Sequence, residues 1–420
     1  MLKALYNELF YDIAGRANAA PAAAPGRLNA AAMAGAVIAD VAREKNLSLE
    51  EMRAQGFGPD EIEALLTKQK LAATARMAHH KTGEAEARKN ATQAAKRLGA
   101  LAYLYDTRKA LAAYAEATQL DPDDWEALWH LGQIQMRAAN LEGAKASLER
   151  LIALHSTLDN PYYIHWSYFL LGDVEATLGS RDKALGHYEC GKALVLALIG
   201  SDPNNVEWQR DLCISYERVG DIKAARGDTD GALIDYRAAF DIAKKLTEKD
   251  PHNTQWRQDL SRYYNRVGDI SAARADRDGA LKAYSDGLEI RKTLAARDPS
   301  NAEWQRDLAV SYNKIGDISA ARGDRGGALK ARKDGLEIFE TLAARDPNNV
   351  VWHTDLVVSA WKIAEAEADD AQFHLADGLA ILKRLDVEKK LTADQKGWIA
   401  HFETALREPP PKPDKPAPPR

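Results

Sequence analysis

The feature that most constrains the fold of this chain is an internal repeat of 48 residues. Three kinds of marker recur at that interval: Asp-Pro pairs at 202–203, 250–251, 298–299 and 346–347; tryptophans at Trp208, Trp256, Trp304 and Trp352; and Gly-Asp pairs at 220–221, 268–269 and 316–317. Gly172-Asp173 has the same phase one step earlier. Several markers that keep register over three to four copies indicate a repeat architecture, so the length of 420 residues does not give a domain count.

Each repeat is predicted to contain two helices. Between Trp256 and Arg274, apolar residues fall three or four apart, and the same spacing continues from Gly279 to Asp298. The Asp-Pro pair ends the second helix, because proline cannot continue a helix but can begin the next one. A missing residue would turn the apolar stripe of a helix by about 100°, which explains the strict spacing. Paired helices of this kind bury their apolar faces against neighbouring pairs, and we therefore expect an all-α fold, an α-solenoid.

The repeat resembles the tetratricopeptide repeat family. Tyr264, Val267-Gly268, Ala280 and Tyr284 match that family's signature in order and spacing. The family unit has about 34 residues, and the additional residues here would lengthen each helix by nearly two turns. Shorter copies precede the long ones, marked by Gly99, Gly132 and Gly172 with the alanines and aromatic or leucine residues that follow them. The resemblance spans roughly residues 90–385 and implies a right-handed superhelix of helix-turn-helix units that binds a partner protein or peptide.

The ends of the chain differ from the repeats. We predict six segments: a non-repeating helical segment 1–90, short repeats 91–202, 48-residue repeats 203–347, a degenerate capping repeat 348–385, a capping helix 386–407 and a disordered proline-rich tail 408–420. An apolar stripe in residues 2–13 is interpreted as a helix that packs on the first repeat or as a membrane-surface or partner helix. Residues 18–27 have the composition of a linker, and Ser48–Glu51 is predicted to form a capping box.

The sequence contains no pattern of catalytic, metal-binding or cofactor-binding residues. HExxH, P-loop and nucleophile-elbow motifs are absent, and Cys190 and Cys213 form neither a metal spacing nor a disulfide framework. We therefore expect no enzyme activity, cofactor, metal or small-molecule substrate. No apolar stretch is long enough to span a membrane, and together with the two cysteines this predicts a cytoplasmic protein. The high alanine content and the long repeat are typical of bacterial proteins.

One segment offers an alternative partner. The stretch from Lys68 to Arg97 contains eight Lys or Arg residues and only two Glu residues, so it could bind nucleic acid or an anionic surface. It contains no aromatic residue to stack on bases, which argues against single-strand recognition and favours a solvated helix face. The net charge of −5 likewise gives no global attraction to nucleic acid.

The resemblance also implies where a partner would bind. In tetratricopeptide arrays the first helix of each unit lines a concave groove, and this pattern assigns nine residues here: Ile214, Glu217, Asp221, Arg262, Asn265, Asp269, Val310, Asn313 and Asp317. With Asp173, the three aspartates would form an electronegative strip for a basic peptide. Alternatively, Arg218, Arg266 and Lys314, three residues before the acids, could neutralise them within each helix. The two-Lys, two-Asn carboxylate clamp of the chaperone-binding members is not matched.

We accordingly expect a non-enzymatic scaffold or adaptor for protein–protein interaction. Two alternatives remain open at this point: a binder of nucleic acid or an anionic surface through residues 68–97, and a regulatory subunit of a bacterial signalling or effector system.

Overall fold

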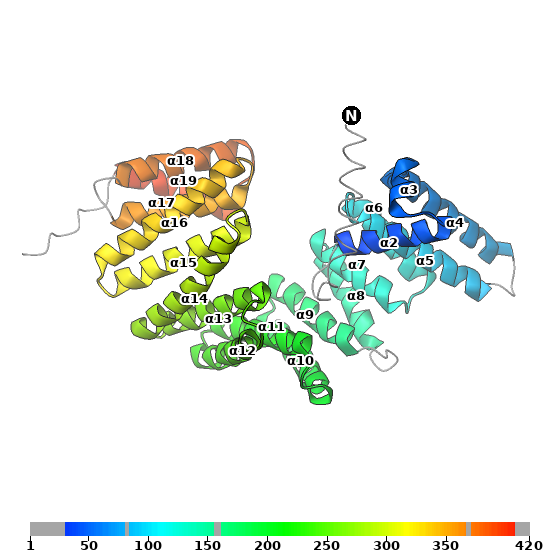
Figure 1. Ribbon diagram of the computed structural model, residues 1–420, viewed down its shortest axis with the longest axis horizontal. Coiled ribbons are helices and arrows are strands. Elements are labelled where there is room, and N and C mark those ends of the chain that lie inside the picture. The colour runs from blue at the N-terminus through cyan, green and yellow to red at the C-terminus, as the bar shows by residue number, and fades with distance from the viewer. Residues whose placement is uncertain (1–29, 80–83, 155–160, 367–370, 408–420) are drawn as a thin grey trace, which may run out of the picture. The chain divides into compact units, whose positions relative to one another are not determined.

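The computed structural model describes residues 30–79, 84–154, 161–366 and 371–407. Every regular element in these residues is a helix, and the helices are labelled α2 to α19 in Figure 1. The chain divides into two compact units, Met1–Ile222 and Lys223–Arg420. The predicted N-terminal stripe, the linker and the proline-rich tail lie outside the described residues.

The first unit contains helices of 6 to 21 residues. Its helices are α2 (Ala30–Lys45), α3 (Leu49–Ala54), α4 (Pro59–His79), α5 (Glu84–Ala102), α6 (Thr107–Leu120), α7 (Trp125–Arg137), α8 (Leu141–Ala153), α9 (Pro161–Thr177), α10 (Arg181–Ser201) and most of α11 (Val206–Ala225). The predicted capping box is confirmed: the Ser48 hydroxyl accepts from the Glu51 amide at 3.1 Å, and the Glu51 carboxylate accepts from the Ser48 amide at 2.7 Å. Ile38, Met52 and Leu101 are buried in one apolar cluster, so α2 to α5 share a core.

The second unit is a row of helix pairs. It contains α12 (Thr229–Lys249), α13 (Thr254–Ala273), α14 (Arg277–Arg297), α15 (Ala302–Ala321), α16 (Arg325–Arg345), α17 (Val350–Ala366), α18 (Ala371–Val387) and α19 (Ala393–Arg407). From α12 to α19 each helix packs against the next one along the chain, as Figure 1 shows. The starts of α13 and α15, and those of α12, α14 and α16, follow one another at 48 residues. This is the stacked-pair architecture that the repeat predicts.

The turn inside each long pair has a simple physical cause. Two positions before the second helix, the backbone is in the left-handed region at Gly227 (φ 83°), Ala275 (φ 62°) and Gly323 (φ 86°). The aspartate that follows caps the second helix: Asp276 accepts from the Gly279 amide at 2.9 Å, and Asp324 from the Gly327 amide at 2.9 Å. The side-chain cap satisfies a backbone donor that the first turn leaves without a partner.

The glycine of each Gly-Asp pair allows the two helices of a pair to approach closely. A Cβ atom on Gly268 would lie 2.4 Å from Cε1 of Tyr284, and one on Gly172 would lie 2.4 Å from Cε1 of Tyr188. Both tyrosines belong to the second helix of the same pair. This contact places the tyrosine hydroxyl beside the neighbouring aspartate, where the candidate site begins.

Candidate functional site

The aspartates of the Gly-Asp pairs are held by the second helix of their own pair. The Tyr188 hydroxyl donates to Asp173 at 2.6 Å, and the Tyr284 hydroxyl donates to Asp269 at 2.7 Å. In the last 48-residue copy an arginine takes the place of the tyrosine, and Arg332 Nη2 donates to Asp317 at 3.2 Å. Each carboxylate is thereby fixed by a donor from the partner helix.

Each of these aspartates also pairs with a cation from the following helix pair. Arg218 lies 3.4 Å from Asp173, Lys314 forms an ion pair with Asp269, and Lys362 forms an ion pair with Asp317. The cation always lies 45 residues after the acid. The Lys314 ammonium also lies 5.5 Å from the centre of the Tyr284 ring. The pairing therefore ties consecutive repeats together.

This geometry corrects the interpretation that the acids are neutralised within their own helix. Arg218 and Lys314 each precede an acid of their own helix by three residues, but Arg218 reaches back to Asp173 and Lys314 reaches back to Asp269. Basic neighbours also mean that the acids do not form an uninterrupted electronegative strip. The side chains of Asp269 and Asp317 nevertheless remain 39% and 44% exposed.

Three of the nine predicted contact residues are buried. Glu217, Asn265 and Asn313 are each less than 10% exposed. With its amide oxygen turned toward Arg291, Asn265 accepts from that guanidinium at 2.7 and 3.2 Å. Asn313 accepts from the Ser359 hydroxyl at 3.3 Å. The two asparagines thus bond to neighbouring helices of the array, and a partner could reach them only if that packing changed.

The remaining predicted residues reach the surface in part. Ile214 and Val310 are half-buried and pack against apolar clusters, while the Arg262 side chain is 35% exposed and pairs with Asp259 at 3.1 Å. Asp221 is half-buried on α11. Of the residues predicted on α13 and α15, those that reach the surface are therefore Arg262, Asp269, Val310 and Asp317.

Two buried arginines were missed in the sequence reading. Arg291 donates to the Ser261 hydroxyl at 3.2 Å, to the Asp307 carbonyl at 3.0 Å and to the Ser311 hydroxyl at 2.7 Å, which joins α13, α14 and α15. Arg332 donates to the Lys362 carbonyl at 2.7 Å and reaches α17 in the same way. The signal for Arg332 was available, because tyrosine occupies its position in each of the three preceding copies.

The described residues offer little for metal or acid–base chemistry. No group of three or more His, Cys, Asp or Glu side chains among them is placed to hold a metal ion. His165 is buried and His130 is partly buried, and loss of hydration lowers the pKa of each to about 4. Cys213 is 1% exposed. In the part of the chain that the structure describes, no helix combines the length and apolarity required to cross a bilayer.

In the basic segment between residues 68 and 97, three of the eight Lys and Arg residues pair with acids of the same unit. Lys70 pairs with Glu116 at 2.6 Å, Lys96 with Asp124 at 2.9 Å and Arg97 with Glu44 at 2.6 Å. Lys96 also reaches Glu126 at 2.6 Å. A phosphate backbone would have to compete with these acids for the three cations.

Comparison with known proteins agrees with this geometry. The family model described as "Tetratricopeptide repeat" matches residues 85–163, and a search of curated proteins returns no match. Among solved structures, the apo form of RapI superposes with a TM-score of 0.53 at 10% identity, covering 90% of this chain and 99% of that one. A tetratricopeptide repeat protein from Parabacteroides merdae gives 0.44 at 15% identity, covering 74% and 98%. YrrB, "a TPR protein with an unusual peptide-binding site", gives 0.34 at 20% identity, covering 55% and 94%.

The fold and its surfaces define an α-solenoid, a class of protein whose stacked repeats present extended binding surfaces. Residues 85–163 match the tetratricopeptide repeat family, and the fold of the chain is similar to that of RapI. The family match falls on the short repeats, and the 48-residue copies follow it along the chain.

Proposed function

We propose that this protein is a non-catalytic scaffold that binds another protein or a peptide on the face formed by the first helices of its repeats. The observation that carries the proposal is the recurrence, on α13 and α15, of a half-exposed residue and an aspartate at equivalent positions: Arg262 with Asp269, and Val310 with Asp317. Equivalent side chains one repeat apart suit an extended partner. The proposed location is cytoplasmic.

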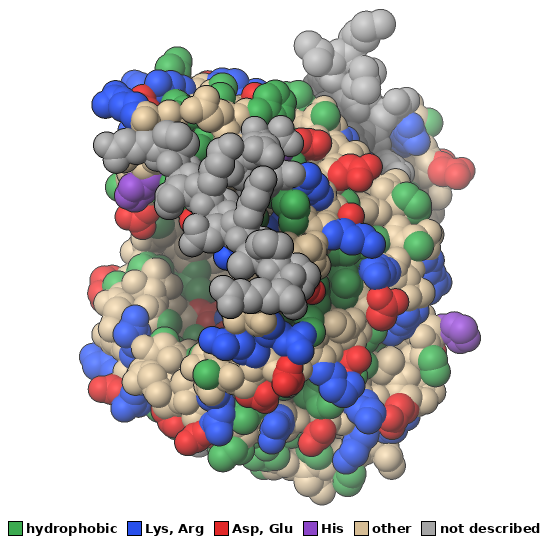
Figure 2. Space-filling model, turned by 90° about the vertical axis from the view of Figure 1, so that its left-hand side faces the viewer, with side chains coloured by type: hydrophobic (Ala, Val, Ile, Leu, Met, Phe, Trp, Pro, Cys, Tyr) green, Lys and Arg blue, Asp and Glu red, His purple; other side chains and the backbone are tan. Residues whose placement is uncertain are grey.

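A partner with basic groups fits this face best. Asp269 and Asp317 keep 39% and 44% of their side-chain surface exposed, although each already accepts an ion pair. A basic side chain of the partner would compete with Lys314 or Lys362 for the same carboxylate, and such exchange of exposed partners costs little. Figure 2 shows Lys and Arg interspersed with Asp and Glu over the side of the molecule that it presents, which suits a partner of mixed charge with basic groups at the aspartates.

Site-directed photo-crosslinking tests the proposal. A photoreactive residue at Val310, on α15, should capture the partner in native extract, and the captured protein should also bind in purified form. The control position is Ile234 on α12, which is 70% exposed on a second helix. Capture at Ile234 but not at Val310 would place binding elsewhere.

Charge removal tests the same face independently. The double change Asp269→Asn and Asp317→Asn should weaken binding of the purified partner and flatten its dependence on salt, because screening acts on exposed charges. Unchanged affinity at low ionic strength would remove the aspartates from the binding surface.

A further inference from the structure

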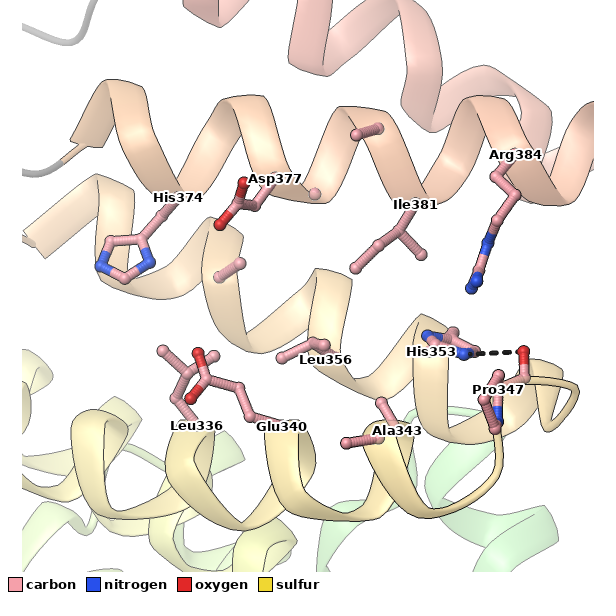
Figure 3. Close-up of a pocket in the computed structure, with 14 residues that line it drawn as sticks. Leu336, Glu340, Ala343, Pro347, His353, Leu356, His374, Asp377, Ile381 and Arg384 are labelled. Atoms are coloured by element: carbon pink, nitrogen blue, oxygen red, sulfur yellow. Dashed lines mark hydrogen bonds between the residues drawn. The ribbon is translucent and has the colours of Figure 1, made fainter.

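A cavity of about 600 Å³ lies in the second unit between α16, α17 and α18. Figure 3 shows its arrangement: Leu356 and Ile381 lie in the middle, Glu340, Asp377 and His374 lie at one end, and Arg384 and His353 lie at the other. None of the nine predicted groove residues lines it. It is therefore a different surface from the proposed groove.

The cavity occurs where the preceding copies place an aromatic ring. The first helices of three copies carry Tyr216, Tyr264 and Tyr312 at one position, and the next copy carries Ala360. Tyr264 packs on the Phe240 ring with centroids 4.7 Å apart, and Tyr312 packs in a cluster with Leu288, Ala295, Leu308 and Ile338. The residues equivalent to that cluster are Leu336, Ala343, Leu356 and Ile381, and all four line the cavity. The cavity thus retains the apolar socket of the repeat but lacks the ring that fills it.

The charge at this socket is also reversed. Lys292 lies 5.8 Å from the centre of the Tyr312 ring, and Lys244 occupies the same position one copy earlier. The equivalent residue at the cavity is Glu340, and Asp377 lies at the same end. The site has therefore lost both the aromatic ring and the ammonium group that accompanies it in the preceding copy.

A buried histidine, His353, lies at the other end of the cavity. The His353 side chain is buried, and its Nε2–H donates to the Pro347 carbonyl at 3.0 Å. Nδ1 is buried and has no hydrogen-bond partner among the described residues. Burial and the nearby Arg384 lower the pKa of His353, so Nδ1 is an unprotonated acceptor at neutral pH.

We propose that this cavity is a second docking site, for a peptide segment of a partner protein that inserts an aromatic side chain against Ala360 and places a Lys or Arg beside Glu340 and Asp377. The aromatic and basic residues of the partner peptide would take the places that Tyr312 and Lys292 occupy in the preceding copy. Apolar walls bind the ring, and the acidic end selects the adjacent basic residue.

Binding of labelled peptides by fluorescence anisotropy tests this site. The probes are a panel of short peptides with one tyrosine and two lysines at varied spacings, and matched peptides with Tyr→Ala or Lys→Glu. We expect at least one Tyr/Lys probe to bind and each replacement to weaken it by about tenfold or more, because each removes one of the two interactions. Equal affinity for the Tyr→Ala peptide would overturn the proposal. Tyramine binding as tightly as the peptides would also overturn it and assign the cavity to a small molecule.

The repeat itself supplies the variants. Ala360→Tyr restores the ring of the other copies and should abolish probe binding, whereas Val358→Tyr adds a ring on the same helix outside the cavity and should leave binding unchanged. Glu340→Lys restores the lysine of the preceding copies and should weaken binding of the Tyr/Lys probe. Because this variant changes a surface charge only, it tests the site even if Ala360→Tyr fails to fold. Undiminished binding by Glu340→Lys would refute the role of the acidic end.

The proposed groove on α13 and α15 and the proposed cavity site can be refuted independently of each other. Asp269→Asn with Asp317→Asn should leave probe binding at the cavity intact, and Ala360→Tyr should leave photo-capture at Val310 intact. Loss of probe binding in the aspartate variant would show that the probes bind the groove, and would refute the cavity as their site.

Discussion

The close contact between Gly268 and Tyr284 predicts that Gly268→Ala destabilises the protein. Alanine is a better helix former than glycine by about 1 kcal/mol, so helix propensity alone favours the change. Three atoms of the Tyr284 ring, however, lie 2.4–3.0 Å from the position of the new Cβ. The ring must move, and overpacking of this kind costs about 1–3 kcal/mol.

Movement of the ring also affects the aspartate. The Tyr284 hydroxyl donates to Asp269 at 2.7 Å, and loss of a hydrogen bond to a charged group costs about 1.5–3 kcal/mol. Combining these contributions, we expect the free energy of unfolding to fall by about 1.5–5 kcal/mol. The measurement is denaturant unfolding followed by far-ultraviolet circular dichroism, with the wild type in parallel.

Two variants make the reasoning specific. Gly186 is exposed inside α10 and a Cβ there meets no atom within 4 Å, so Gly186→Ala should stabilise by up to about 1 kcal/mol. Gly268→Ala combined with Tyr284→Leu should recover part of the loss, since Gly132 faces Leu148 in an earlier pair at 3.0 Å from the Cβ position. A stabilising effect of Gly268→Ala similar to that of Gly186→Ala would refute the packing argument.

Three further predictions follow from single positions. Ala275 has φ 62°, a strained backbone conformation for alanine, where two other copies have glycine. Ala275→Gly should therefore stabilise the protein by about 1 kcal/mol, and Gly323→Ala should destabilise it by about 1–2 kcal/mol, both measured by denaturant unfolding. Effects of equal sign would contradict this backbone strain. Burial raises the pKa of Asp211 to about 7, whereas the unfolded chain releases this proton near pH 4. The protein therefore loses stability as the pH rises from about 4 to about 7. Asp211→Asn should remove this decline from the measured profile of stability against pH. Burial lowers the pKa of His165 to about 4, so the stability contributed by its neutral form is complete above about pH 6.5 and is lost as the pH falls toward 4. His165→Gln should reduce the loss of stability between pH 6.5 and 4. An unchanged loss would show that His165 does not titrate on unfolding.

Much of the helical organisation could be predicted because it depends on local chemistry. Asp-Pro ends a helix through the geometry of proline, and Asp276 and Asp324 cap the next helix through their own side chains. The Gly-Asp pair marks close approach because only glycine leaves room for the facing side chain. These signals act within a few residues or within one pair, so the sequence expresses them directly.

The tryptophans illustrate a partial failure of sequence reasoning. A large apolar residue that recurs with the repeat favours a fully buried position, but Trp208, Trp256, Trp304 and Trp352 are half-buried, and Trp352 packs on a cluster formed by α15 and α16. Each stands in the first turn of a helix, and the amides of Trp256 and Trp304 donate to the capping asparagines at 3.1 Å. A residue at a helix end contacts the core along one edge only. The spacing of the tryptophans therefore indicates the repeat correctly, but it does not indicate that their side chains are fully buried.

The pairing of the aspartates could not be predicted, because it depends on how consecutive pairs rotate against one another. Along the sequence, Lys314 is closer to Asp317 than to Asp269, and the helical spacing favours the nearer acid. In the structure, the stacking of α15 on the preceding pair brings its ammonium to Asp269 instead. Burial of Asn265 and Asn313 follows from the same rotation, which turns their side chains toward neighbouring helices.

Departures from the repeat are more informative about function than the repeat itself. Where Tyr284 becomes Arg332, the carboxylate contact survives, because Arg332 donates to Asp317 and also reaches α17. Where Tyr312 becomes Ala360, nothing in the described residues replaces the ring, and the cavity remains. A substitution that preserves a contact by other means indicates that the contact stabilises the array. One that leaves an apolar socket open, with Lys292 replaced by Glu340 beside it, leaves a surface that a partner can complete.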